Sequence, residues 1–253
     1  MICNWEPSTS YKPGYLNSLR YSSLLCGLSC RTHIVAYETS PFREGKAMDM
    51  LVHSSSTTAD AQQELVKWQA DRTYWAETLP VMKMLSEFLI LSPVLHRQIA
   101  TVSTDGRHLY FCPRYSASLS DESRRFLHAH LIWHCVAGHL TAPLVADRHR
   151  WHLACDHEVN ALLLALGIPL PLHALLFPVC VGRSAIEVYH WLEGHPDTSL
   201  EVTTDIHPAA LWSHFPNATP DQRMTALWRH RAHLIARESD ALPDRVAKFC
   251  ESR

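Results

Sequence analysis

The sequence predicts a mainly helical α+β domain that carries a small β-hairpin. Stretches with apolar side chains at helical spacing follow one another from residue 58 onward, separated by proline, glycine and capping residues. Among them, the runs 99–103 and 108–112 are rich in β-branched or aromatic residues and flank Thr104-Asp-Gly-Arg107, a turn signal. Nearly half of the 253 residues are apolar, which is enough for one core of ordinary size.

The amino-terminal part differs in composition from the rest. Residues 1–57 are rich in Ser, Tyr, Pro and Thr and show no sustained period, which predicts a poorly structured extension before a domain of residues 58–253. Cys26, Cys30 and His33 have a spacing that a metal site can use, but we expect unpaired thiols there.

Two helices are expected before the hairpin. The first starts at Thr58 and ends at the break before Pro80, and its apolar residues recur at helical spacing. The second covers residues 81–91 and is stopped by Pro93. Both are expected to pack on the core.

Two long helices follow the hairpin. Ser120 is a capping residue, and Asp121 and Glu122 in the first turn are favourable against the helix dipole, so a helix is predicted to run to about Gly138. Residues 149–166 form the next, which Gly167 closes. These two helices carry the candidate site.

The carboxyl-terminal part is predicted to add shorter elements. After a proline-rich loop at 168–183, Ser184 and Glu187 form a capping box that opens a helix ending at Gly194. A second capping box at 219–222 opens a helix at 220–237, and one short helix is expected in the tail from residue 239.

Histidines cluster in the two long helices. The chain has 18, and seven lie within thirty residues. His130 and His134 are four residues apart, so they project from one helix face and can share a divalent metal ion. Zinc is the metal that we expect. Asp156 on the following helix is the expected third ligand. Asn160, one turn further, is expected to orient the Asp156 carboxylate.

Other readings of these residues stay open. His139 is the rival third ligand, although helical rotation points it away from His130 unless the helix breaks before it. His152 lies on the same helix face as Asp156. It can be a metal ligand, a hydrogen-bond donor to a ligand, or a half-buried surface histidine. Asp156 itself can be an exposed helix carboxylate, or it can form a salt bridge with Arg148 or Arg150.

The residue directly after His130 bears on whether the site can catalyse peptide hydrolysis. Zinc peptidases place a glutamate directly after that histidine, where it takes a proton from water, and this chain has Leu131 there. A leucine cannot take a proton. Glu158 and Tyr189 are the candidate catalytic residues in its place, with His139 and His152 as further possibilities.

Several ordered landmarks point to one known family. The chain resembles the zincin-like metallopeptidase domain that accompanies von Willebrand factor A-like domains in bacteria, in the segments 100–106, 110–113, 119–120, 130–139, 156–160 and 184–189. The resemblance implies a zincin-like fold with His130, His134 and Asp156 at a metal. It also implies a MoxR-type ATPase or a separate von Willebrand factor A-like protein as partner. Leu131 departs from the family's usual glutamate.

These observations leave two functions open. One is a metal-dependent enzyme that acts on a peptide or protein, by hydrolysis with a relocated base or by a non-hydrolytic modification. The other is an inactive pseudo-peptidase that serves as a protein-binding module.

Composition bounds the partners and the compartment. With 23 Lys and Arg against 25 Asp and Glu and no basic block, we expect neither nucleic acid nor membrane as partner. The eight scattered cysteines read as reduced thiols, and no secretory signal or long apolar run is visible, so the expected compartment is the cytoplasm.

Overall fold

The computed structural model describes residues 46–95, 99–141, 145–195, 201, 203, 205–207, 222–239 and 242–252. All of them belong to one compact unit, Gly45–Arg253. The cysteine and histidine group at positions 26, 30 and 33 lies outside the described residues, and the proposed extension 1–57 stays a prediction.

The first helix begins earlier than the sequence predicted, and the second ends earlier. Helix α1 covers Lys46–Thr78 and so begins before residue 58, and α2 covers only Pro80–Ser86. The prediction of a helix to residue 91 was wrong, because Ile90–Pro93 forms strand β1. A short apolar run such as 88–91 fits a helix or a strand equally well, and here backbone bonds to a neighbouring strand decide it: the Ile90 amide donates to the Arg107 carbonyl at 2.8 Å.

The predicted hairpin is confirmed and forms part of a three-stranded sheet. Strand β2 (Val102–Thr104) pairs antiparallel with β3 (His108–Phe111), and β1 adds to the other edge of β3 in parallel. Gly106 in the turn has φ 83°, and an added Cβ would lie 2.6 Å from Met224, so glycine is required there for both conformation and space.

The helix that bears the histidines ends where the sequence predicted. After a short helix α3 (Pro113–Ala117) that was not predicted, α4 covers Asp121–Ala137. The Ser120 side chain accepts from the Ser123 amide at 3.1 Å, and Gly138 ends the helix with φ 83°. This cap lets the chain turn sharply after His134.

The remaining helices also follow their sequence signals. Helix α5 (Arg148–Ala165) starts at the capping residue Asp147, and α6 (Ala185–Glu193) follows the predicted capping box after a 3-10 turn, Pro178–Cys180. Helices α8 (Gln222–Glu238) and α9 (Asp244–Glu251) form the carboxyl-terminal pair. The start of the predicted capping box at Thr219 lies outside the described residues.

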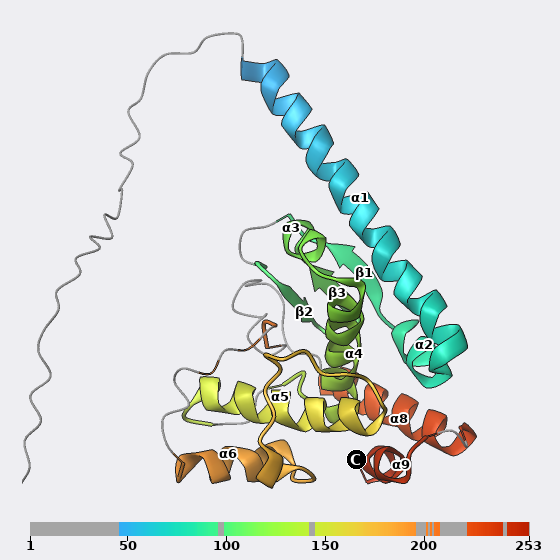
Figure 1. The fold of residues 1–253 in the computed structure, drawn as a ribbon, viewed down its shortest axis with the longest axis vertical. Helices are drawn as coiled ribbons and strands as arrows, with labels where there is room; N and C mark the ends of the chain where they lie inside the picture. Colours follow the sequence, from blue (N-terminus) through green and yellow to red (C-terminus); the bar gives the residue numbers. More distant parts are fainter. Residues whose placement is uncertain are drawn as a thin grey trace, which may run out of the picture. The chain divides into compact units, whose positions relative to one another are not determined.

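Helix α4 is the central element of the domain (Figure 1). It contacts α1, α2, β2, α5 and α8, and α6 lies on the side of α5 away from α4. The main apolar cluster joins α1, α2, the sheet, α4, α5, α8 and α9, and a second one joins α5 to α6. The fold is therefore mainly helical α+β, as expected. No helix among the described residues is long and apolar enough to cross a bilayer.

Candidate metal centre

The predicted ligands come together where α4 crosses α5. His130 and His134 lie one turn apart on α4, and Asp156 faces them from α5. Their side chains are at most 3% exposed. The crossing of two helices whose residues are mostly buried brings the three groups together in the interior.

A fourth residue, Asp205, joins this group and was missed by the sequence reasoning. The Ile206 amide donates to the Val102 carbonyl at 2.9 Å, and the Ser103 hydroxyl donates to the Ile206 carbonyl at 2.7 Å, so the segment is bound to the free edge of β2. Its neighbour Asp205 thereby reaches the α4 histidines. One possible signal was the β-branched run before it, which favours pairing with a strand.

The potential ligand atoms of these four residues all lie within 4.8 Å of one another. The Nε2 atoms of His130 and His134 are 2.9 Å apart. Asp156 Oδ1 lies 3.4 Å from His134 Nε2 and 3.7 Å from His130 Nε2. Asp205 places Oδ2 at 3.8 Å from His134 Nε2. We refer to His130, His134, Asp156 and Asp205 as the four-residue cluster.

Asn160 sets the orientation of His130. Its Nδ2 donates to the Leu175 carbonyl at 2.8 Å, so its Oδ1 is the atom that faces His130 Nδ1 at 3.0 Å. An amide oxygen only accepts, so His130 Nδ1 donates and Nε2 carries a lone pair. Asn160 therefore orients the imidazole of a candidate ligand, whereas the sequence predicted that it would orient the Asp156 carboxylate.

His139 and Glu158 do the same for His134. Glu158 Oε2 lies 3.0 Å from His139 Nε2, and His139 Nδ1 lies 3.1 Å from His134 Nδ1. A carboxylate accepts, so a neutral His139 donates from Nε2 and accepts at Nδ1. His134 then donates from Nδ1 and carries its lone pair on Nε2. The break at Gly138 thus places His139 beside His134, where it contacts the Nδ1 atom of a candidate ligand.

The cluster has too many acceptors for its donors. Two imidazole lone pairs face each other at 2.9 Å, and two carboxylates face them. Asp156 Oδ1 and Asp205 Oδ2 are buried and have no hydrogen-bond donor among the described residues. Such an arrangement requires a cation, either protons or a metal, and two histidines with carboxylates suit zinc and similar ions.

The pKa values reflect the same imbalance. Burial, together with the neighbouring His130, lowers the pKa of His134 to about 4. Burial also opposes a charge on His130, but the Asp156 and Asp205 carboxylates raise its pKa above the usual value. Without a metal, a proton on His130 therefore takes part of the cation's place.

One comparison with known proteins bears on this centre. Residues 85–193 match the family described as "Putative metallopeptidase domain". No curated protein and no solved structure matched the chain. The metallopeptidase-like segment, as we call residues 85–193, contains three members of the four-residue cluster, whereas Asp205 lies beyond it. Its match implies a metal, and the cluster is a group that can bind one.

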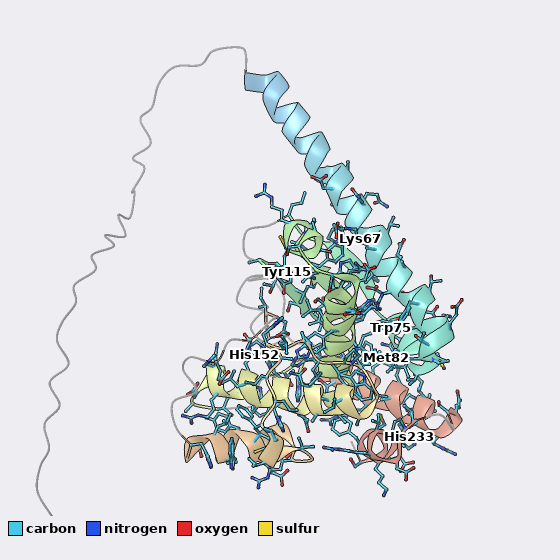
Figure 2. The ribbon with its side chains drawn as sticks, in the orientation of Figure 1. Lys67, Trp75, Met82, Tyr115, His152 and His233 are labelled. Atoms are coloured by element: carbon cyan, nitrogen blue, oxygen red, sulfur yellow. The ribbon has the colours of Figure 1, made fainter. Side chains whose placement is uncertain are left out.

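Two further histidines border the cluster. His152, near the beginning of α5 (Figure 2), places Nε2 at 2.8 Å from Asp205 Oδ1 and 3.3 Å from Asp156 Oδ1. Burial opposes its charge, but the two carboxylates raise the pKa of His152 to about 10, so it donates to Asp205 and places a positive charge beside Asp156. His207 packs edge-on against the His152 ring, and burial holds its pKa well below the usual value.

The metallopeptidase-like segment has no base in the usual position. Leu131 is fully buried and belongs to the main apolar cluster. Tyr189, the other catalytic candidate besides Glu158, lies on α6, where its hydroxyl accepts from the Asp147 amide at 3.3 Å and its ring packs near Trp151. The structure brings neither Glu158 nor Tyr189 into the four-residue cluster.

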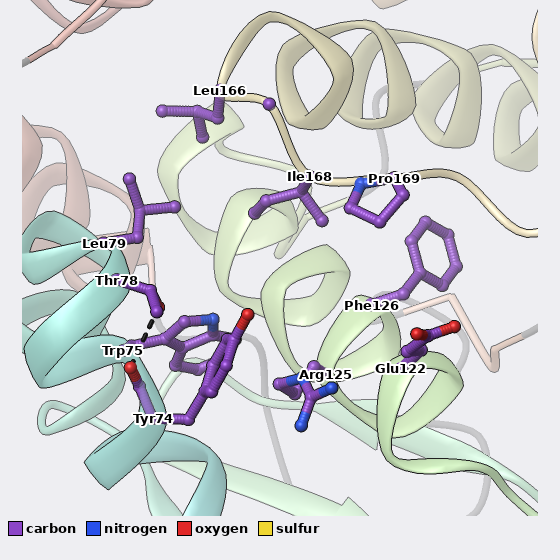
Figure 3. A pocket seen from close by; sticks show the side chains of 11 residues that line it. Tyr74, Trp75, Thr78, Leu79, Glu122, Arg125, Phe126, Leu166, Ile168 and Pro169 are labelled. Atoms are coloured by element: carbon purple, nitrogen blue, oxygen red, sulfur yellow. Dashed lines mark hydrogen bonds between the residues drawn. The ribbon is translucent and has the colours of Figure 1, made fainter.

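A cavity of about 230 Å³ lies beside the amino-terminal half of α4 (Figure 3). Its walls come from α1, α4 and the chain after α5, and the Arg125 guanidinium lies over the Tyr74 ring at 4.3 Å. Phe126 lines this cavity, and its ring centroid is 5.5 Å from that of His130. The Phe126 ring therefore borders both the cavity and His130 of the candidate metal centre.

Proposed function

We propose that this protein is a zinc-dependent, zincin-like enzyme that acts on a peptide or protein, with the base moved from position 131 to Asp205. The observation that carries the proposal is the convergence of four buried acceptors within 4.8 Å of one another, three of them inside the segment that matches a metallopeptidase family. A set of acceptors that lacks donors is stable only around a cation.

The residues fit a catalytic zinc site. His130, His134 and Asp156 would hold the ion, which gives the three protein ligands that are usual in catalytic centres. Asp156 Oδ1 has no hydrogen-bond donor among the described residues, so it is available as a ligand. A zinc ion in such a site supplies a Lewis acid that polarises a carbonyl group and makes water more acidic.

Asp205 would then be the general base that takes a proton from water. Its Oδ2 has no donor among the described residues and lies 3.8 Å from His134 Nε2, so it can accept a proton from a water molecule beside the ligands. His152 donates to the other oxygen, Oδ1, at 2.8 Å and fixes the carboxylate orientation. The His152 side chain is 11% exposed, the most open in this group, so a proton held there can pass to solvent or product.

A second candidate follows from the same geometry. Asp205 can instead be the fourth ligand, because its oxygen lies within the 4.8 Å group. A centre closed by four protein ligands is structural, and the leucine at position 131 then has no catalytic consequence. The protein would in that case be a pseudo-peptidase that serves as a binding module.

Metal analysis tests the part that both candidates share. Purified protein is expected to contain about one equivalent of zinc, and His130→Ala and His134→Ala are expected to lose most of it. His190→Ala, on the exposed side of α6, is a matched control that should keep the metal. Wild-type protein that is folded and binds no divalent metal would overturn the proposal.

Asp205→Asn separates the two candidates. If Asp205 is the base, this variant keeps its zinc and loses cleavage of a labelled unfolded protein, which the wild type cleaves. If Asp205 is a ligand, the variant loses zinc and the wild type does not cleave. Zinc content and cleavage are measured on the same preparations, so each candidate predicts a distinct pair of results.

The partners and the compartment are part of this proposal. The resemblance to a family that accompanies MoxR-type ATPases and von Willebrand factor A-like proteins supports a partner of either kind. The five cysteines among the described residues are free thiols, which supports a reducing compartment such as the cytoplasm.

A further inference from the structure

Two adjoining cavities lie on the side of α5 that faces α6 and α9. The larger, about 370 Å³, is lined by α5, the chain before α6 and α9. The smaller, about 240 Å³, is lined by the end of α4 together with α5, α6 and α8. Glu158 and Ser184 line both, so the two cavities share a wall.

Cationic side chains surround these cavities. Arg183, Arg245 and Lys248 line the larger cavity, and Arg229 lines the smaller. All four are exposed. Within the part of the chain that the structure describes, none of them has a carboxylate partner within 4.0 Å. Their charges are therefore available to a ligand.

The two carboxylates in the cavity walls already have partners within the protein. Glu158 lies 3.0 Å from His139 Nε2. Glu187 accepts from the Ser184 amide at 2.8 Å and from the Ser184 hydroxyl at 2.7 Å. Because the acids are committed to partners within the protein and the bases are not, the cavity complements a negatively charged ligand.

The size and the remaining walls narrow the class of ligand. Ala161, Leu162 and Phe249 give the larger cavity an apolar part, and its volume falls in the range of roughly 300–1,000 Å³ that is typical of sites for organic ligands. A lone inorganic anion would leave this apolar surface uncovered. A peptide with acidic residues beside an apolar one would cover both kinds of wall.

We propose that these cavities bind an acidic stretch of polypeptide, with its carboxylates at Arg183, Arg245 and Lys248 and an apolar side chain against Phe249. The site uses none of the residues of the four-residue cluster. Glu158 connects it to the metal centre, because the same carboxylate holds His139, which holds His134. The proposal stands apart from catalysis, so it can fail or succeed whether or not the protein is an enzyme.

The test is a binding titration with three acetylated, amidated peptides that contain one leucine among glutamates, glutamines or lysines. Fluorescence anisotropy is measured with the full chain, once zinc-loaded and once with chelator. We expect the glutamate peptide to bind in both states and the other two to bind much more weakly. Arg245→Gln/Lys248→Gln should weaken binding about threefold to tenfold, as expected for two partly screened ion pairs.

Arg237→Gln is the matched control, because it removes an exposed arginine of α8 that lines neither cavity. It should bind the glutamate peptide like the wild type. Equal binding of the glutamate and glutamine peptides, or equal affinity in wild type and Arg245→Gln/Lys248→Gln, would overturn the proposal. Displacement of the peptide by inorganic phosphate at low millimolar concentration would overturn the assignment to a polypeptide.

Discussion

Helix α4 carries buried polar groups on two different faces, and they are built differently. On one face, Arg124 donates to both oxygens of Asp71 at 2.9 and 2.8 Å, and to Asp121 at 2.8 Å. On another face, about 100° of helical rotation away, His130 and His134 meet two further acceptors. The first group is balanced in donors and acceptors, and the second is not.

The difference indicates what each group is for. Asp71 and Arg124 are 1% and 3% exposed, and their two parallel hydrogen bonds compensate for the loss of water. The four-residue cluster is as deeply buried but holds acceptors that no described donor satisfies. A balanced group holds elements of the fold together, whereas an unbalanced group is stable only with a ligand. The predictions below test this contrast.

The largest effect is expected from breaking the balanced group. Asp71→Asn leaves the Arg124 charge buried without its carboxylate, so the free energy of unfolding should fall by about 3–5 kcal/mol. Urea unfolding followed by circular dichroism, with chelator present, measures it. Asp121→Asn removes an exposed partner of the same arginine and should cost less than about 1 kcal/mol.

Replacing both partners sharpens this prediction. Asp71→Leu/Arg124→Met removes donors and acceptors together, so it should be clearly more stable than Asp71→Asn. A double variant that is no more stable than the single one would show that packing, and not charge balance, dominates this face of α4.

The next effect concerns Leu131, which lies in the core between the two groups. Leu131→Glu buries a carboxylate among apolar side chains, so the free energy of unfolding should fall by about 3 kcal/mol. Leu131→Met keeps the volume and should cost less than about 1.5 kcal/mol. If Leu131→Glu unfolds like the wild type, position 131 faces the metal centre and a glutamate there has a functional environment.

A smaller effect, on zinc affinity, is expected from Glu158, which contacts His134 through His139. Glu158→Gln weakens the chain of contacts that fixes the His134 tautomer, so zinc affinity should fall about 10-fold to 100-fold. Competition with a fluorescent zinc chelator measures it. Tyr189→Phe, on α6 and outside this chain of contacts, should bind zinc like the wild type. Equal zinc affinity of Glu158→Gln and wild type would contradict the role given to His139.

The sequence predicted the elements that have local signals. Ser120 and Gly138 bound α4 because capping is a property of neighbouring residues, and the spacing of His130 and His134 follows from the helix alone. The strand Ile90–Pro93 was missed because its partner, β3, is fixed by contacts between segments that are distant along the chain. Local pattern cannot distinguish such a run from a helix.

The same limit explains which contacts of the site the sequence did not predict. Asp205 reaches the cluster through a bond between Ile206 and Val102, residues about a hundred positions apart, which no spacing rule reveals. His139 was the rival third ligand, which helical rotation points away from His130 unless the helix breaks before it. The sharp turn at Gly138 instead places it between His134 and Glu158. The residue types indicated a metal site, but the contacts of Asp205 and His139 depend on how distant segments pack in the fold.

The last prediction is smaller than the first. In metal-free protein, burial and the repulsion by Asp156 oppose the charge on Asp205, but His152 attracts it at 2.8 Å, and the net effect lowers the pKa of Asp205. Asp205→Asn should therefore lower the free energy of unfolding, but by less than about 2 kcal/mol, because the amide oxygen still accepts from His152 and the repulsion is gone. Chemical unfolding in chelator compares it with Asp71→Asn under the same conditions. If the two asparagine variants lose similar stability, both groups are structural, and the acceptor excess does not mark a cation site. A much larger loss in Asp71→Asn supports a cation site, because a carboxylate that is only partly compensated in the empty site costs little to neutralise.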